Sequence, residues 1–343
     1  MRIILIGFGV VGQSVARVLL EKTSSLIRDY GVSPRIVAIV DSHGCARSPK
    51  GLDLNEALAA KEKLGSVSRM PDFGAPEMTS TEVIENTDAE IIVEMTPTNV
   101  VTGEPGLTNI KTALKNGKHV VTSNKGPLAL ALPSLTELAL YNRVELRFGG
   151  SVGAGTPMLE FAKKCLLGNE ILSARGILNG TTNFILNAMT DRKISFSEAL
   201  REAQQKGYAE ADPSSDTKGI DTACKLVIIG NWVMGMPVSL SDVRIKGIEG
   251  ITVDDIEQAT SQRSTIKLIG EIDSHLSVSP KMISWEDPLS GIRGAFNAIT
   301  FQTSIAGEQT LIGLGAGGRV TSSAILSDII DIAYAVRRTG DRT

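Results

Sequence analysis

The first half of the chain alternates short apolar runs with amphipathic stretches. Runs such as Arg2–Ile6, Arg35–Val40 and Glu90–Met95 have the length and composition of buried strands. Between such runs, Val10–Arg28 and Pro127–Tyr141 repeat apolar residues at helical spacing. Strands that alternate with helices predict βαβ units and a mostly parallel sheet. The same pattern predicts a helix near 106–116 and strands over 119–122 and 144–148.

The pattern changes in two places. From about Gly44 to Glu82 it is weak, and we expect a short helix and loops at the sheet edge. At Gly149 a glycine-rich connection begins, followed by a helix near Thr156 and by mixed helical and strand-like runs. We therefore expect a first domain over 1–148 and an α+β domain over 149–309. The last stretch is a glycine loop followed by an amphipathic helix.

Composition excludes several classes of protein. The chain has 343 residues, 42% of them apolar, and a net charge of −3, which is unlike the basic footprint of a nucleic-acid binder. No apolar run approaches the ~18 residues of a membrane span. The three cysteines and three histidines are widely spaced, which argues against a disulfide framework or a zinc site. We expect a cytoplasmic protein with no nucleic-acid or membrane partner.

A glycine-rich turn follows the first strand. Gly7, Phe8, Gly9, Val10, Val11 and Gly12 form the pattern G-x-G-x-x-G. An apolar strand precedes this turn and a helix begins inside it, which is the context of a dinucleotide-binding turn. The glycines then serve the tight turn, the approach of a pyrophosphate and helix packing. We expect residues 1–148 to be a Rossmann-type dinucleotide-binding domain with helices on both faces of its parallel sheet.

An acidic residue ends the second strand. Asp41 follows Gly12 by 29 residues. A carboxylate there binds both ribose hydroxyls and repels a 2′-phosphate, which favours NAD over NADP. Arg47 and Lys50 follow soon after, and their positive charges are able to hold a 2′-phosphate. NADP therefore remains an alternative cofactor.

Polar residues in the middle of the chain are candidates for chemistry. Thr96 and Lys125 each follow a strand of the expected parallel sheet, where such sheets bind ligands. The turn with Gly180 and Thr181 suits either a polar substrate or a plain helix cap. Asp221 and Lys225 are four residues apart on a largely apolar helix and share one face. A charged pair on such a helix points to a ligand cavity.

Together these segments resemble the homoserine dehydrogenase family. The motifs follow the family's order and cover most of the chain, and they read GFGVVGQ at 7–13, EMTPTN at 94–99, TSNKGPL at 122–128, GSVGAGTP at 150–157, GILNGTTNFIL at 176–186, YAEADPSSD at 208–216, GIDTACK at 219–225 and GLGAGGRVTSSA at 313–324.

The resemblance implies reversible, NAD(P)-dependent interconversion of L-homoserine and L-aspartate 4-semialdehyde. It implies Lys225 as the acid–base group, with Lys125 assisting near the nicotinamide and the substrate. Substrate binding then falls to Glu210, Asp216, Asp221, Gly180 and Thr181. The cofactor is held by the Gly7–Gly12 turn together with Asp41, Thr96, Lys125 and Gly317.

The resemblance also sets expectations about a metal and the architecture. Relatives bind a monovalent cation such as sodium through carbonyls that match Val152, Ala154 and Thr156, but the acidic residue that begins their site is Gly149 here. The C-terminal helix, within 310–343, should return to the first domain. The strands near 275–305 should build a sheet that pairs across a homodimer. No regulatory domain is expected.

Other functions remain open from the residues. An aspartate semialdehyde dehydrogenase needs a cysteine nucleophile, and Cys224 lies about 100° around the helix from Lys225. Another NAD(P)-dependent amino-acid dehydrogenase forms an imine instead of an aldehyde. A non-catalytic NAD-sensing protein would need a partner module, for which the charge pattern offers no sign.

Overall fold

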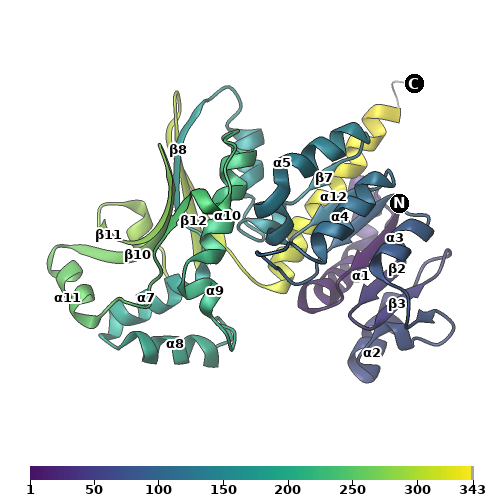
Figure 1. Cartoon of the computed structure of the whole chain (residues 1–343), viewed down its shortest axis with the longest axis horizontal. Coiled ribbons are helices and arrows are strands. Elements are labelled where there is room, and N and C mark those ends of the chain that lie inside the picture. The colour runs from purple at the N-terminus through teal and green to yellow at the C-terminus, as the bar shows by residue number, and fades with distance from the viewer. Residues whose placement is uncertain (341–343) are drawn as a thin grey trace. The chain divides into compact units, whose positions relative to one another are not determined.

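The computed structural model of the protein describes residues 1–340, with side chains up to residue 337. It divides into two compact units. Unit 1 comprises Met1–Ser151 and the chain from Gly317 onward, and unit 2 comprises Val152–Ala316. In Figure 1 the purple start and the yellow end of the chain therefore lie in the same unit.

Unit 1 is built around a sheet in the order β4-β3-β2-β1-β5-β6-β7. The five strands β2, β1, β5, β6 and β7 pair in parallel, and β3 and β4 add an antiparallel edge. The strands are β1 (Arg2–Ile6), β2 (Arg35–Asp41), β3 (Gly44–Arg47), β4 (Gly74–Ala75), β5 (Ile91–Glu94), β6 (His119–Thr122) and β7 (Leu146–Arg147).

Helices cover both faces of this sheet (Figure 1). Helices α1 and α12 pack together, and their apolar residues share a core with Ile3 and Leu5 of β1. Helix α4 contacts both α3 and α5. The helices are α1 (Val10–Tyr30), α2 (Leu54–Leu64), α3 (Ser80–Asn86), α4 (Gly106–Lys115), α5 (Lys125–Tyr141) and α12 (Gly318–Gly340), with short 3-10 turns η1 (Val67–Arg69) and η2 (Gly149–Ser151).

Unit 2 contains a mostly antiparallel sheet in the order β13-β12-β8-β10-β11-β9. Only the β11–β9 pairing within it is parallel. The strands are β8 (Ile171–Ile177), β9 (Val243–Ile245), β10 (Ser264–Ile272), β11 (Leu276–Ser284), β12 (Phe296–Thr303) and β13 (Gly307–Leu314).

Two helices of unit 2 pack on strands that come later in the chain. Helix α7 lies directly after β8 and contacts β10, and α10 contacts β10 and β11. The helices are α6 (Met158–Glu160), α7 (Gly180–Arg192), α8 (Phe196–Gln205), α9 (Ser214–Thr217), α10 (Ile220–Trp232) and α11 (Val253–Ser261), with shorter turns η3 (Phe161–Cys165, a π turn), η4 (Leu240–Asp242) and η5 (Pro288–Gly291).

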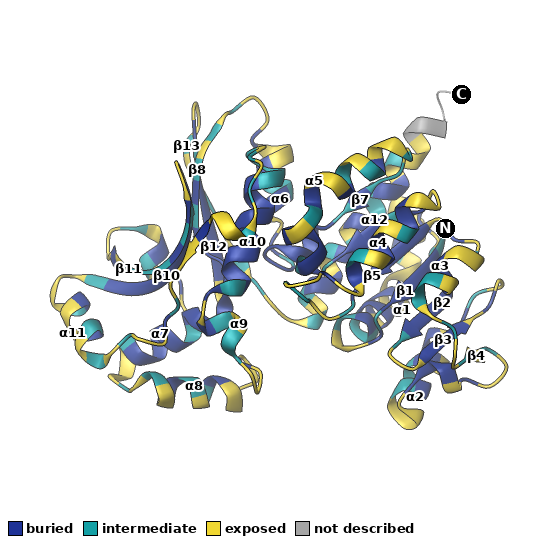
Figure 2. Cartoon of the chain, viewed as in Figure 1, coloured by how far each residue is buried: buried dark blue, intermediate teal, exposed yellow. Residues whose placement is uncertain are grey.

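The apolar strands and long helices predicted from the pattern are present, and the expectation of an α/β fold with a parallel sheet is confirmed. Burial follows the alternation, with dark blue strands inside and yellow helix surfaces outside (Figure 2). Within residues 1–340, no helix is both long enough and apolar enough to cross a membrane.

Several element boundaries differ from the prediction. The weak segment 44–82 contains the short helix α2, but also the edge strands β3 and β4. The C-terminal helix begins at Gly318, within the expected range, but it is preceded by a strand that was not predicted, because Gly307–Leu314 pairs with β12 as strand β13. Helices α9 and α10 are separated at Gly219, whose φ of 85° is not helical.

Candidate functional site

The glycine turn after β1 has the shape that its sequence predicts. A side chain at Gly7, where φ is +91°, would come within 2.6 Å of the Met95 backbone. One at Gly12 would lie 2.1 Å from the Gly7 carbonyl, so this glycine allows α1 to begin close to the strand. Space is open at Gly9, and no side chain caps the N-terminus of α1. The free N–H groups and helix dipole there suit a pyrophosphate.

A buried carboxylate organises the ends of β5 and β6. Glu94 accepts hydrogen bonds from the amide and the hydroxyl of Thr96, and from the Thr122 hydroxyl at 3.1 Å. Asn124 caps α5 and donates to the Thr96 hydroxyl at 3.2 Å. Burial raises the pKa of Glu94. This network holds Thr96 and the first turn of α5 in place. Helix α5 begins at Lys125, which is half-buried.

Asp41 is not an open carboxylate at the end of β2. Its side chain is only 3% exposed and pairs with Lys61 of α2 at 2.8 Å. It also accepts hydrogen bonds from the Ser66 hydroxyl and the Val67 amide. Burial opposes its ionisation, but these donors together lower the pKa of Asp41 below its ordinary value. Arg47 and Lys50 are exposed.

Unit 2 brings together a cluster of charged residues at the start of α7 and α10. Lys225 and Asp221 form an ion pair at 2.7 Å, with side chains only 7% and 10% exposed. Lys225 also donates to the Leu178 carbonyl at 2.5 Å. Asn179 donates to Asp221 at 2.9 Å and to Asp216 at 2.7 Å. We call Asn179, Asp216, Asp221 and Lys225 the acidic cluster.

The acidic cluster holds two carboxylates and one ammonium. Burial, and next the nearby charge of Asp221, raise the pKa of Asp216. With both carboxylates ionised the cluster has a net negative charge. Such a site attracts a cation, and a partly buried one does so strongly because screening by water is weak.

The turn that carries Asn179 caps a helix and also contacts the acidic cluster. Asn179 caps α7 by accepting a hydrogen bond from the Thr182 amide at 2.9 Å. Its amide nitrogen remains available for the two carboxylates. Gly180 follows it, and Thr181 donates to the Tyr208 carbonyl at 2.7 Å. The cap therefore orients the same side chain that links Asp216 to Asp221.

Glu210 lies apart from the hydrogen bonds of this cluster. Glu210 is exposed and lies on the segment between α8 and α9. Gln204 donates to its main-chain carbonyl at 3.2 Å. The structure thus places the Glu210 backbone but does not join its carboxylate to the acidic cluster.

The carbonyls expected to hold a cation are a poor match for a tight site. Val152, Ala154 and Thr156 are buried in a tight turn, and Ala154 has a φ of 49°. The Thr156 carbonyl already accepts the Met158 amide at 2.7 Å. Gly149 supplies no side-chain oxygen, and the Asp328 carboxylate beside it accepts the Gly149 amide at 2.9 Å. Among the described residues, no group of three or more His, Cys, Asp or Glu is arranged to hold a metal.

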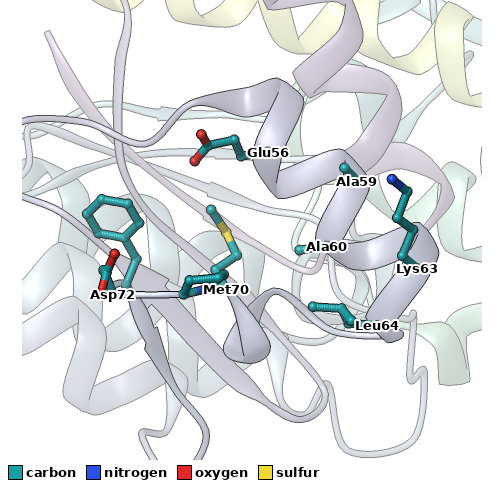
Figure 3. A pocket seen from close by; sticks show the side chains of 9 residues that line it. Glu56, Ala59, Ala60, Lys63, Leu64, Met70 and Asp72 are labelled. Carbon is teal, nitrogen blue, oxygen red and sulfur yellow. The ribbon is translucent and has the colours of Figure 1, made fainter.

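A pocket in unit 1 lies away from the glycine turn in sequence. It has a volume of about 470 Å³ and lies between one face of α2 and residues Met70–Phe73 (Figure 3). Its lining includes Glu56, Lys63 and Asp72, which are at the edge of an apolar floor. None of the residues predicted to bind cofactor or substrate lines it.

Four groups at these sites were not among the predicted functional residues: Glu94, Lys61, Asn179 and the Leu178 carbonyl. Asn179 carried a signal, because an Asn before Gly-Thr-Thr is a helix cap. Glu94 also carried one, since a charged residue that ends an apolar run is unusual inside a sheet. Nothing local marks Lys61 or a main-chain carbonyl.

Comparisons with known proteins agree along the whole chain. The family model for homoserine dehydrogenase matches residues 157–330, and the model for its NAD-binding domain matches residues 7–148. The homoserine dehydrogenase of Methanocaldococcus jannaschii is 45% identical over 98% of this chain and all of its own length. The chain belongs to the homoserine dehydrogenase family.

Two further proteins give the same result. An NAD(+)-dependent homoserine dehydrogenase of Pseudomonas canavaninivorans is 38% identical over the whole of this chain and 99% of its own. The crystal structure of a putative homoserine dehydrogenase from Archaeoglobus fulgidus superposes with a TM-score of 0.89 at 40% identity, covering 97% of this chain and 99% of that one.

The activity follows from the family. The enzyme is an NAD(P)-dependent oxidoreductase that acts on a CH–OH group and interconverts L-homoserine and L-aspartate 4-semialdehyde. This decides among the functions that the residues alone left open, including a thiol-dependent semialdehyde dehydrogenase and a non-catalytic sensor.

Proposed function

We propose that Lys225 is the acid–base group of the reaction. The observation that supports this best is its hydrogen bonding, because Asp221 and the Leu178 carbonyl take two of the three positions around its nitrogen. One position remains for the substrate oxygen. During oxidation of homoserine, Lys225 acts as the neutral amine, whose lone pair at that position accepts the hydroxyl proton, and during reduction its ammonium returns a proton to the same oxygen. The bound nicotinamide supplies the hydride chemistry.

We propose that the acidic cluster binds the α-ammonium group of homoserine. Asp216 and Asp221 exceed Lys225 by one charge, which suits a cation. The Gly180–Thr181 turn lies beside Asn179 and forms part of the same pocket. Glu210 contributes from the α8–α9 segment when substrate is present, although it stands apart from the cluster here.

For the cofactor we propose binding at the Gly7–Gly12 turn of unit 1, with Thr96, Lys125 and Gly317 close to its nicotinamide end. The open space at Gly9 and the uncapped start of α1 support this. Gly317 precedes α12 with a φ of 115°. In this arrangement unit 1 is the dinucleotide-binding domain and unit 2 is the substrate and dimerisation domain, close to the boundaries 1–148 and 149–309.

We propose NAD as the preferred cofactor, with only moderate discrimination against NADP. Asp41 stays ionised and so opposes a 2′-phosphate, as the sequence suggests. Lys61 neutralises part of this charge at 2.8 Å. The ion pair thus reduces the difference in affinity between NAD and NADP. The positive charges of the exposed Arg47 and Lys50 reduce it further.

The test of the acid–base role replaces Lys225 with a neutral side chain of similar length. Lys225→Met should lower kcat about 10²- to 10⁴-fold, the usual contribution of a positioned acid–base group. NADH binding, measured by fluorescence titration, should stay within twofold, because the glycine turn is in unit 1. Lys218→Met, at an exposed lysine just before α10, is the matched control. Turnover of Lys225→Met near that of the control would refute the role.

We propose that the enzyme is a homodimer formed through the β12–β13 side of the unit 2 sheet. Strand β13 is the last strand of that sheet. Phe296, Ile312 and Leu314 lie on neighbouring register positions and are exposed. A free strand edge beside apolar side chains favours pairing with a second copy. Light scattering should give twice the chain mass, and Ile312→Arg should reduce it to one chain, whereas Leu140→Arg in unit 1 should not.

Two smaller proposals complete the assignment. The three cysteines form no disulfide with one another, which suits a reducing compartment, and we propose a cytoplasmic location. No step of the mechanism above depends on a monovalent cation. Replacing sodium chloride by choline chloride at equal ionic strength should therefore leave kcat unchanged.

A further inference from the structure

A fully buried lysine in unit 2 has no place in the mechanism above. Lys267 lies in the middle of β10 and is 0% exposed. Its ammonium donates to Asn183 Oδ1 at 2.9 Å, Asn187 Oδ1 at 2.6 Å and the Ile292 carbonyl at 2.6 Å. All three acceptors are neutral, and each of its three hydrogens has one. Burying an ammonium without a counter-charge lowers the stability of the fold. A lysine at this position therefore requires an explanation.

The partners of Lys267 all hold one short segment. Asn183, on α7, donates to the carbonyls of Ile292, Gly294 and Phe296 at 3.4, 3.0 and 3.2 Å. Asn187 donates to the Ile292 carbonyl at 3.4 Å. We call Lys267, Asn183 and Asn187 the buried brace. It fixes residues 292–296, which connect η5 to β12.

The braced segment lies directly behind the acidic cluster. A side chain at Gly180 would come within 2.6 Å of the Ala295 carbonyl, so the segment packs against the turn that carries Asn179. One residue further along, the buried Asn297 donates to the Leu178 carbonyl at 3.0 Å. That carbonyl is the one that accepts the hydrogen bond from Lys225.

We propose that Lys267 is a positioning residue, which through residues 292–297 fixes the Leu178 carbonyl and the Asn179–Gly180 turn around Lys225. This rests on the proposed role of Lys225. The chain of contacts runs from Lys267 to the Ile292 carbonyl, then along the backbone to Ala295 and Asn297. A charged donor suits the first link, because hydrogen bonds from an ammonium are stronger than those from a neutral amide.

Neighbouring charges do not provide a competing explanation. Arg293 pairs with Asp191 at 2.6 Å, and both are exposed. Lys281, the register partner of Lys267 on β11, pairs with Glu271. Among the described residues, no carboxylate lies within ion-pair distance of the Lys267 ammonium, so the role of this lysine lies in the segment that it holds. Burial, and next the charge of Arg293, lower the pKa of Lys267 to about 7.

The experiment compares two lysine-to-methionine changes on facing positions of one sheet. Lys267→Met removes the brace, and Lys281→Met is the control because it leaves residues 292–296 untouched. We expect Lys267→Met to lower kcat/KM for homoserine about tenfold or more, mainly through kcat, since one charge-assisted hydrogen bond has about that effect. The KM for NAD should stay within twofold. Lys281→Met should match the wild-type enzyme in all three constants.

Folding is followed independently of activity. Both tryptophans, Trp232 and Trp285, are in unit 2, so their fluorescence reports whether that unit is native in each variant. If Lys267→Met is not native at the assay temperature, Asn187→Ala decides the question, because it removes one acceptor of the brace and leaves the lysine. A loss of about threefold or more in kcat/KM for homoserine supports the proposal.

A native Lys267→Met enzyme with unchanged kcat would overturn it, as would unchanged kcat in Asn187→Ala when that variant is the one used. Equal losses for homoserine and NAD would also overturn it, because they indicate a general structural effect. Measuring Lys225→Met in parallel separates the two proposals. Normal turnover there refutes the acid–base role itself, whereas a large loss there with a normal Lys267→Met enzyme refutes only the brace.

Discussion

Each unit of the enzyme contains a buried pair of an aspartate and a lysine, and the two pairs differ in their surroundings. In unit 1, Asp41 and Lys61 lie 2.8 Å apart. In unit 2, Asp221 and Lys225 lie 2.7 Å apart. Asp41 takes further hydrogen bonds from Ser66 and Val67, whereas the unit 2 pair shares Asn179 with a second carboxylate, Asp216.

The protonation of the carboxylates follows this difference. Burial disfavours the charged form of Asp41, but the hydrogen-bond donors around it outweigh this effect and lower its pKa. The ionised carboxylate therefore stabilises the fold at pH values above the ordinary pKa of an aspartate. Burial and the charge of Asp221 raise the pKa of Asp216, so its charge opposes folding at neutral pH. The same two residue types thus stabilise the fold in unit 1, whereas in unit 2 they hold the unbalanced charge that we propose binds the substrate.

The variant with the largest expected effect removes the ion pair between Asp221 and Lys225 in unit 2. Asp221→Asn removes the negative charge beside Lys225 and leaves one side-chain oxygen as an acceptor. We expect kcat/KM for homoserine to fall about 100-fold, because a buried ammonium is left without its counter-charge. Steady-state kinetics with homoserine and NAD measure it, with the exposed Asp254→Asn as the control in the same unit. A loss below about threefold would mean that the pair is structural, like that of unit 1.

A second variant separates function from stability. Asp216→Asn keeps the shape of the side chain and removes the charge. We expect the KM for homoserine to rise about tenfold, because the substrate ammonium loses one carboxylate. We also expect the Tm to rise at pH 7.

The sign of the Tm change follows from linkage. A carboxyl group with a raised pKa contributes most to stability when the pH is below the ordinary pKa of 3.8. That contribution is lost as the pH rises through the raised pKa. The gain from Asp216→Asn should therefore be larger at pH 7 than at pH 4, as thermal unfolding at both values will measure. A Tm that drops equally at both would contradict the assignment of unbalanced charge.

The smallest expected effect sharpens the picture of the unit 1 pair. Lys61→Met leaves Asp41 without its cation, so repulsion of a 2′-phosphate should increase. We expect the ratio of kcat/KM for NAD to that for NADP to rise about fivefold, which is the usual size of a partly screened charge interaction. Lys63→Met, on the same helix but exposed, should leave the ratio unchanged. An unchanged ratio in Lys61→Met would place the pair outside cofactor selection.

Local patterns predicted the parts of the molecule that depend on local sequence. The apolar runs of β1, β2 and β5, and the four-residue spacing of Asp221 and Lys225, each indicate their own structure. Strand β13 was not predicted, because a half-buried edge strand shows no alternation and is defined by its pairing with β12.

Contacts between distant residues were beyond such patterns. The partner of Asp41 is 20 residues away, and only the folding of α2 against β2 brings it there. Lys267 looks like a solvent-facing position on a strand until α7 and residues 292–296 cover it. The candidate substrate residues were thus chosen by residue type, whereas the geometry that the structure gives them depends on tertiary contacts.

The return of α12 to unit 1 has a consequence for the order of synthesis. Ile325 and Ile329 of α12 complete the core that α1 begins, and Arg319 pairs with Glu21. On the ribosome, α1 emerges first and α12 last, with the whole of unit 2 made between them. The nascent chain therefore finishes its substrate half while α1 still has a bare apolar face. We therefore expect a chain that is truncated before Gly318 to leave this face of α1 uncovered and to bind the dinucleotide more weakly.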